Sequence, residues 1–383
     1  MSASGIEVAD VLRRFLEEYL RRYGGPRVSE QRRAIADILG CMTEEMGGKR
    51  YRCADCGKGF WQYHGCRNRS CPKCHGRQTQ QWIEARSAEL LPCDYFHVVT
   101  TVPAELRPAF RAEQKYMYDL LMKISAAALC ELAADRRYLG AVPAIMSVLH
   151  TWNGWMLDHI HAHMLVSGGG VSADGENWHE GSPRFLVPVK KLSPLVAKRF
   201  REALSKGRPD LYAAVPARAW KRQWCSFCKP VGEGREEVVN YLARYVYRVA
   251  VNRHRILAMD ESHVTFKHKR HDTGEWKTVR ITGIEFIRRF LLHVLPRGFH
   301  KVRYYGLWHS SKRQLMDRAR VLLQLSGKLR KDQPVETIAE LAAEALPGCD
   351  SETPAISCPK CGSLNLCLVE ELRKGDRSRL GTQ

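Results

Sequence analysis

The amino-acid sequence predicts an α+β fold built around an antiparallel sheet. Segments with the residue pattern of β-strands outnumber those with helical periodicity. The two kinds do not alternate regularly, which argues against a parallel, doubly wound sheet. The chain has 383 residues, of which 44% are hydrophobic and 27% charged, so it can form a sizeable core and two or three structural units.

The N-terminal elements are predicted to be two helices. Apolar residues recur at steps of three and four over residues 8–20, and the Gly-Gly-Pro sequence at 24–26 ends this helix. A second, shorter helix is expected at 30–39. The stretch 51–75 has few aliphatic residues and many Cys, Gly and Arg residues. Something other than an apolar core must therefore hold it together.

The central part of the chain is predicted to contain most of the sheet. The run 95–102 is rich in β-branched and aromatic residues and is followed by Pro103. The glycines at 168–170 are expected to end a strand that begins at Met156. We also expect strands at 144–152, 156–166 and 185–189, an extended segment at 220–229, and helices at 108–134, 195–205, 235–253 and 284–294.

These patterns predict three domains. Residues 1–90 would form an N-terminal module of helices and metal-bound cysteines, residues 91–320 the main domain, and residues 321–383 a C-terminal tail. No run of about 18 apolar residues is present, so we expect no membrane span. The acidic N-terminal segment lacks the pattern of a secretory signal, so a cytoplasmic protein is expected.

The charge of the chain indicates a polyanionic partner. Its 61 Lys and Arg residues against 41 Asp and Glu residues give a net charge of +20. Nucleic acid is the simplest partner for such an excess, with the basic segment 244–320 as the binding channel. A basic surface without a partner is the alternative.

Four cysteines in two pairs predict a zinc site. Cys53 and Cys56 form one Cys-x-x-Cys pair, and Cys71 and Cys74 form another, about 14 residues further on. This spacing can place four thiolates around one tetrahedral Zn²⁺, whose binding would replace the missing apolar core. A redox or fortuitous cluster is the alternative. Further candidate ligands nearby are Cys41, Cys66, His64 and His75.

Basic and aromatic residues surround these cysteines. Arg67, Arg69 and Lys73 are expected to contact DNA phosphates, while Phe60 and Trp61 could stack on exposed bases. The alternative is a purely structural knuckle whose basic residues are only solvated.

The remaining Cys-x-x-Cys pairs give weaker signals. Cys225 and Cys228 lie in an extended apolar stretch, where residues three apart point to opposite faces, so we interpret them as core or surface thiols. Cys358 and Cys361 form a better metal knuckle in a polar tail. With Cys367 they make three cysteines, one ligand short of a second zinc site.

Three histidines form the second main signal. On a strand, His159, His161 and His163 project to one face, whereas Ile160 and Ala162 project to the other. Two imidazoles at i and i+2 can hold a divalent ion. A solvated edge strand is the alternative, but the apolar neighbours indicate partial burial, where imidazoles without a partner are costly.

Two tyrosines form the third signal. On a helix, Tyr241 and Tyr245 share a face that Arg244 and Arg248 border. Guanidiniums neutralise phosphate and lower the cost of a phenolate, so the group suits phosphoryl chemistry. Packing at the edge of the core would explain the tyrosines alone. Combined with a histidine-bound Mg²⁺ or Mn²⁺, however, they gain a role as nucleophiles.

The order of these motifs resembles that of a known family. The sequence Cys-Arg-Asn-Arg-Ser-Cys-Pro-Lys-Cys at 66–74 precedes His-Ala-His at 161–163 and the glycines at 168–170. Tyr-Leu-Ala-Arg-Tyr at 241–245 and the stretch 288–299 follow. From about residue 41 to residue 308 the chain resembles rolling-circle transposases of the insertion-sequence-91 type, which are two-tyrosine HUH enzymes.

This resemblance implies a central strand that carries the metal ligands His161 and His163, beside a helix that presents Tyr241 and Tyr245. One tyrosine would cleave single-stranded DNA at transposon ends or target, keep the 5′ phosphate as a phosphotyrosine and free a 3′-OH. The second would allow strand transfer. A third metal ligand is normal in such sites, and its candidates here are His159 and His97.

The same residues also fit functions other than transposition. A plasmid replication initiator or a relaxase would share the chemistry, but the zinc module and the lack of a helicase-like P-loop favour a transposase. A non-catalytic, zinc-dependent DNA-binding regulator would form no covalent product. The transposase would act in the cytoplasm at the nucleoid, and the sequence leaves its oligomeric state open.

Overall fold

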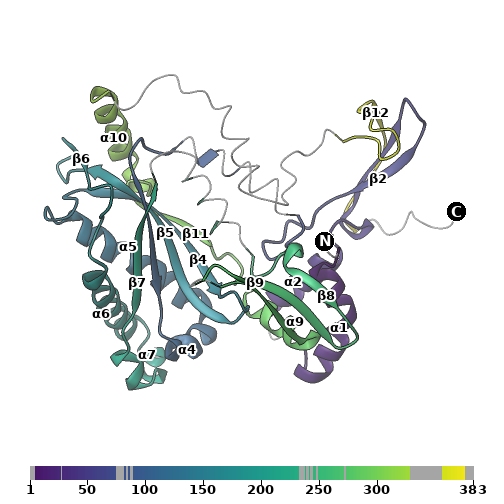
Figure 1. Ribbon diagram of the computed structural model, residues 1–383, viewed down its shortest axis with the longest axis horizontal. Coiled ribbons are helices and arrows are strands. Elements are labelled where there is room, and N and C mark those ends of the chain that lie inside the picture. The colour runs from purple at the N-terminus through teal and green to yellow at the C-terminus, as the bar shows by residue number, and fades with distance from the viewer. Residues whose placement is uncertain are drawn as a thin grey trace.

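The computed structural model places most of the chain in two apolar cores and one narrow projecting sheet (Figure 1). It describes residues 5–26, 28–74, 82, 85, 86, 89–232, 238, 241, 245, 246, 249–270, 273–327 and 356–375. Within these residues, no helix combines the length and the apolar character that crossing a bilayer requires.

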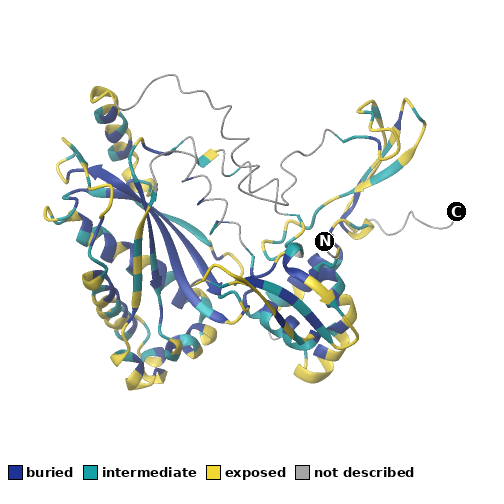
Figure 2. Cartoon of the chain, in the orientation of Figure 1, coloured by how far each residue is buried: buried dark blue, intermediate teal, exposed yellow. Residues whose placement is uncertain are grey.

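The larger core surrounds an antiparallel sheet with the strand order β11-β4-β5-β3-β7, and β6 pairs with the end of β5. Its strands are β3 (Tyr95–Thr101), β4 (Val142–Trp152), β5 (Asp158–Val171), β6 (Trp178–Glu180), β7 (Cys225–Gly232) and β11 (Val302–Gly306). Every pair is antiparallel, which confirms the predicted α+β class. The central strand β5 is buried along almost its whole length (Figure 2).

Helices cover one face of this sheet. They are α4 (Arg107–Ala112), α5 (Gln114–Ala134), α6 (Val189–Gly207) and α7 (Pro209–Ala214), and α10 (Arg313–Leu325) lies near β5 and β6. Ile160, Ala162 and Met164 of β5 share a core with these helices. Because side chains alternate along a strand, His161 and His163 lie on the opposite face.

The predicted end of β5 at the glycines 168–170 is wrong. The strand continues to Val171 and pairs there with β4 and β6. A Cβ atom at Gly169 would lie 2.2 Å from the ring of Trp178, so glycine lets the β6 side chain cross the strand. The glycines therefore serve close packing rather than chain reversal.

Two smaller expectations also differ from the structure. The helix predicted at 108–134 is interrupted at Glu113, whose φ of −135° is not helical, and so forms α4 and α5. The strand predicted at 185–189 is reduced to one bridge between Ser182 and Phe185. Most of the helix predicted at 235–253 lies outside the described residues.

The smaller core joins the N-terminal helices to a later part of the chain. It contains α1 (Val8–Tyr23), α2 (Ser29–Leu39), α9 (Gly283–Leu292) and a sheet formed by β8 (Ile256–Met259), β9 (His263–Lys269) and β10 (Trp276–Thr282). Phe15 of α1 and Phe286 of α9 lie in the same cluster of buried residues. The three-domain division stays a prediction, and the packing shows that its first two parts share a core.

The third unit, here called the arm, is an antiparallel sheet with the order β12-β1-β2. Its strands are β1 (Gly48–Cys53), β2 (Gly59–Tyr63) and β12 (Leu366–Leu372). The arm projects at the upper right of Figure 1, and much of its surface is exposed in Figure 2. Residues Leu366–Leu372 of the predicted C-terminal tail are thus one strand of this N-terminal sheet.

Candidate active site

Three histidines from two neighbouring strands converge on the face of the central sheet opposite the helices. His161 and His163 lie on β5, and His150 of β4 is paired with His161 across the two strands. One ligand nitrogen of each ring lies within 4.8 Å of the others, and all three residues are buried. The structure thus brings the two expected ligands together and adds a third.

Each of these rings has one nitrogen hydrogen-bonded to a neighbouring group. His161 Nδ1 donates to the carbonyl of His159 at 2.6 Å, and His150 Nε2 donates to the carbonyl of Tyr245 at 2.7 Å. His163 Nδ1 lies 2.8 Å from His97 Nε2. Metal-binding histidines usually make such a bond with their second nitrogen, because it fixes the ring and its tautomer. The donor set therefore fits a divalent metal ion.

The two histidines proposed as third ligands do not belong to this cluster. His97 on β3 supports His163, and burial lowers the pKa of His159, which lies beside His161 without joining the converging nitrogens. The missed residue, His150, had a detectable signal. Pairing the two strands predicted at 144–152 and 156–166 as a hairpin would have set it opposite the histidine run.

The two predicted tyrosines pack directly on the histidines. The ring centroid of Tyr245 lies 4.5 Å from that of His163 and 6.1 Å from that of His150. Tyr241 lies 4.9 Å from His97, and the two phenol rings are 4.7 Å apart. Tyr245 therefore lies directly beside the histidine cluster, and Tyr241 packs on Tyr245 and on His97.

The two phenols have different surroundings. Tyr241 is 5% exposed, and its hydroxyl has no hydrogen-bond partner among the described residues. Burial, and next the neighbouring Tyr245, raise the pKa of Tyr241 well above its ordinary value. Tyr245 is only partly buried. Arg244 and Arg248, which were expected to border the phenols, lie outside the described residues.

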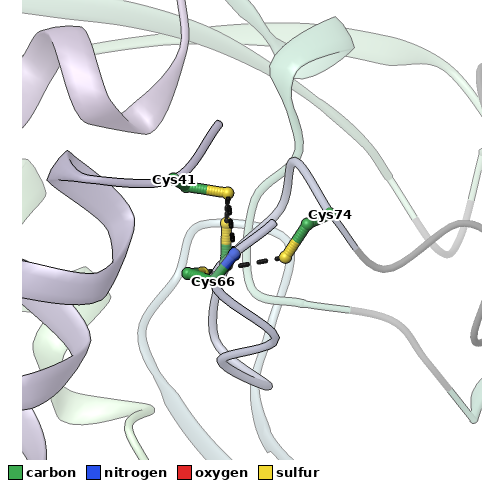
Figure 3. A group of neighbouring side chains, drawn as sticks. Cys41, Cys66 and Cys74 are labelled. Carbon is green, nitrogen blue, oxygen red and sulfur yellow. Dashed lines mark hydrogen bonds between the residues drawn. The ribbon is translucent and has the colours of Figure 1, made fainter. Parts of the chain in front are cut away.

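Eight of the described cysteines form two clusters of four, so the predicted grouping of Cys53 and Cys56 with Cys71 and Cys74 around one ion is wrong. Cys71 and Cys74 lie with Cys41 and Cys66 (Figure 3), with sulfur–sulfur distances of 3.6 Å for Cys71–Cys41 and 3.7 Å for Cys66–Cys74. The predicted partners Cys53 and Cys56 form the turn between β1 and β2. This hairpin carries them to the far end of the arm, away from residues 66–74.

The first cluster is built into the smaller core. Cys41 and Cys71 are buried among its apolar residues, and a hydrogen bond with the Cys66 thiol is the main cause that lowers the pKa of Cys41 to about 7. Asn68 Nδ2 donates to the carboxylate of Asp37 on α2 at 3.0 Å. Four converging thiols suit a structural zinc ion.

The basic residues around this cluster have unequal roles. The guanidinium of Arg69 donates to the carbonyls of Leu295, Pro296 and Phe299, so it fastens the zinc loop to the segment after α9. Arg69 thus has a structural role, and its contact with DNA stays a prediction. Lys73 forms an ion pair with Glu7 at 2.9 Å, whereas the side chain of Arg67 is exposed.

The basic segment 244–320 is likewise only partly available for a polyanion. Arg255 is buried and donates to three backbone carbonyls. Glu285 pairs with both Arg288 and Arg289. The register of β9 with β10 places Lys269 opposite the exposed Trp276 at one end of the sheet. This end remains a candidate surface for nucleic acid.

Comparisons with known proteins find two matching family models. Residues 144–315 match the family described as "Putative transposase", and residues 11–102 match the "Transposase zinc-binding domain". The second range contains all four cysteines of the cluster around Cys41.

Two curated sequences are also similar to this chain. "Putative transposase y4qJ" of Sinorhizobium fredii (strain NBRC 101917 / NGR234) is 38% identical over 344 residues, which cover 85% of this chain and 86% of that protein. "Transposase for insertion sequence element IS801" of Pseudomonas savastanoi pv. phaseolicola is 26% identical over 308 residues, 75% of this chain and 72% of that protein. No solved structure gives a significant match.

Proposed function

The chain belongs to the insertion-sequence-91 family of transposases with an N-terminal zinc-binding domain, and from this we propose that it nicks and rejoins single-stranded DNA through a phosphotyrosine. The observation that supports the proposal most directly is the packing of Tyr245 on His163, with ring centroids 4.5 Å apart. A nucleophile and a candidate metal cluster thus share one face of the sheet.

We propose that His150, His161 and His163 hold a divalent ion, Mg²⁺ or Mn²⁺. When bound, such an ion supplies positive charge to the oxygens of a scissile phosphodiester and helps to orient it. The hydrogen bonds from these rings to His97 and to two backbone carbonyls hold their nitrogens in place before DNA arrives.

The chain's own groups then perform the transfer. The oxygen of one phenol attacks phosphorus, the bond from phosphorus to the 3′ oxygen breaks, and that oxygen leaves with a proton as a 3′-OH. The 5′ phosphate stays esterified to the tyrosine, so the free energy of the phosphodiester is kept and no nucleotide cofactor is required. A 3′-OH of another strand can attack this ester and release the tyrosine.

Two adjacent phenols allow two cleavages without an intervening release. Tyr245 packs on His163, and Tyr241 packs on Tyr245, so each phenol can receive one 5′ end while the other ester persists. Strand transfer between transposon end and target needs two such ends at once. The buried state of Tyr241 favours Tyr245 for the first cleavage.

We propose that the zinc-binding domain recognises the DNA end. Cys41, Cys66, Cys71 and Cys74 would hold one zinc ion, with Arg67 exposed on the same loop. In the adjoining arm, the rings of Trp61 and Tyr63 are stacked 5.8 Å apart and offer a surface on which bases can stack. The protein would act in the cytoplasm, at the nucleoid.

A covalent-adduct assay tests this function. End-labelled single-stranded DNA from the element's own termini is incubated with the protein and Mg²⁺ or Mn²⁺ and resolved on a denaturing gel. We expect a protein–DNA adduct that is lost in the Tyr241→Phe, Tyr245→Phe double variant. A non-catalytic regulator would bind the DNA without any adduct, and a replication initiator would prefer an origin over the element's ends.

A further inference from the structure

A second cluster of four cysteines joins the two ends of the chain. Cys53 and Cys56 at the tip of the arm lie with Cys358 and Cys361, about 300 residues later in the sequence, and the ligand sulfurs all lie within 4.8 Å of one another. The sulfur–sulfur distances are 3.6 Å for Cys53–Cys361 and 3.4 Å for Cys56–Cys358. Neither cysteine of the tail lies in the part that matches the zinc-binding family model, residues 11–102.

The two contributing turns have the same local geometry. In each, a glycine follows the second cysteine in the left-handed conformation, with φ of 68° at Gly57 and 75° at Gly362. The Gly57 amide donates to the carbonyl of Cys53 at 2.9 Å, and the Gly362 amide donates to that of Cys358 at 2.8 Å. Such turns direct both thiols of a Cys-x-x-Cys pair to one side, as in metal knuckles.

Hydrogen bonds fasten one turn to the other. Asp55, between the first two cysteines, accepts from Ser363 Oγ at 2.5 Å and from Asn365 Nδ2 at 3.2 Å. The Ala54 amide donates to the carbonyl of Asn365 at 2.9 Å. The juxtaposition of the thiols is therefore built by several specific contacts, and does not depend on the sulfurs alone.

The C-terminal tail contacts the N-terminal module along the whole arm, from its tip to its base. Strands β1 and β12 pair from Cys53 opposite Leu366 to Gly48 opposite Leu372. Lys374, just beyond β12, lies 3.4 Å from the carboxylate of Asp37 on α2. The described tail is thus anchored at both ends of the arm, and Asp37 also holds the loop of the first cysteine cluster through Asn68.

The sulfur spacing distinguishes a metal site from disulfides. Sulfurs at about 2.3 Å from a tetrahedral zinc ion lie about 3.8 Å apart, whereas bonded sulfurs lie about 2.05 Å apart. The observed distances of 3.4 and 3.6 Å are close to the first value and far from the second. The narrow arm, in its described residues, has no apolar core of its own. Binding of a metal ion by the four thiols would supply the stabilisation that such a core otherwise provides.

We propose that Cys53, Cys56, Cys358 and Cys361 bind a second structural zinc ion, which makes the C-terminal tail an integral part of the N-terminal zinc module. The ion would close a loop of the chain that contains the whole catalytic domain. A chain that ends before Cys358 would retain only half of the site, so the site can be completed only after synthesis has passed Cys361.

Alkylation of the purified full-length protein tests the site without any substitution. Cys361 and Cys367 are both exposed on the tail, but only Cys361 lies in the cluster. We expect iodoacetamide to modify Cys367 rapidly and Cys361 slowly, and a zinc chelator to abolish the protection of Cys361. Modification of both at the same rate would overturn the proposal, and so would a protection of Cys361 that only a reductant removes, because that would indicate a disulfide.

Zinc content provides the second measurement. We expect two zinc ions per chain, one after Cys358→Ser with Cys361→Ser, and again one after Cys53→Ser with Cys56→Ser. Combining both pairs should remove no further zinc, since they share one ion. The matched control Cys367→Ser should retain both ions. If the Cys358→Ser, Cys361→Ser variant retained both, the tail would not be a ligand.

Discussion

The ring of Tyr245 lies 4.5 Å from the ring of His163, and the backbone carbonyl of Tyr245 accepts a hydrogen bond from His150. One residue therefore contacts two of the three histidines, once through its phenol ring and once through its backbone. The main chain of the candidate nucleophile thus helps to position it on the histidine cluster. Movement of Tyr245 would disturb the histidines, and loss of the histidines would release Tyr245.

The two tyrosines should differ in the first cleavage. We expect Tyr245→Phe to lower the initial rate of adduct formation by roughly tenfold or more, corresponding to a loss of about 1.4 kcal/mol of transition-state stabilisation. Tyr241→Phe should reduce this rate less, because Tyr241 is 5% exposed and its hydroxyl has no hydrogen-bond partner in the described part of the chain. Single-turnover assays on one DNA end measure both rates.

The control for this comparison is Tyr305→Phe, because Tyr305 packs against the helical core on the other face of the sheet. It should leave the rate unchanged. A larger loss in Tyr241→Phe than in Tyr245→Phe would contradict the assignment of Tyr245 to the first cleavage.

The pH dependence of the two single variants should also differ. Burial raises the pKa of Tyr241 well above its ordinary value, so a smaller fraction of this phenol is ionised at neutral pH. The residual reaction of Tyr245→Phe, which relies on Tyr241, should therefore keep rising to higher pH than that of Tyr241→Phe. Initial rates between about pH 6 and pH 9 test this, and identical profiles would argue against the effect of burial.

His150 should be required for binding of the metal ion at the active site, whereas the nearby His159 should not be required. We expect both His150→Ala and His161→Ala to abolish the metal-dependent adduct, because each removes one of the converging nitrogens. His159→Ala removes an imidazole next to the cluster and serves as the matched control. Adduct yield against Mn²⁺ concentration provides the measurement, and equal losses in the His150 and His159 variants would refute a specific ligand role.

Substitution of Arg67 should affect DNA binding, whereas substitution of Arg69 should affect the stability of the fold. Arg67→Ala should weaken binding to single-stranded DNA and reduce the slope of log affinity against log salt by about 0.7, the value for one lost phosphate contact. Arg69→Ala should instead lower the free energy of unfolding by about 2 kcal/mol, since three carbonyls after α9 lose a charged donor. The measurements are the salt dependence of DNA binding and the denaturant-induced unfolding of both variants. Loss of stability in Arg67→Ala and loss of DNA affinity in Arg69→Ala would contradict the two assignments.

Loss of zinc from the first cluster should disturb the smaller core before the active site. In the Cys66→Ser, Cys74→Ser variant we expect the melting temperature to fall by on the order of 10 °C, because Cys41 and Cys71 are buried beside α1 and α9. Binding to the element's ends should fall as well. Cys225→Ser is the control, as Cys225 is exposed and outside both clusters. Full affinity in the zinc-free variant would exclude a role of this cluster in end recognition.

The sequence by itself indicated the family of this protein and most of its local structure. Period-two alternation put His161 and His163 on one face of a strand, and period-3.6 spacing put Tyr241 and Tyr245 one turn apart, because both relations depend only on local backbone geometry. The α+β class followed from the order of these segments.

Tertiary structure alone decided which distant residues meet. Strand pairing brought His150 to the cluster, and the length of the β1–β2 hairpin separated Cys53 and Cys56 from the other knuckle, so that Cys358 and Cys361 became their partners. Cysteine spacing predicts which thiols can share a turn, but not which turns share an ion. That choice depends on contacts between segments far apart in the chain, which local spacing does not contain.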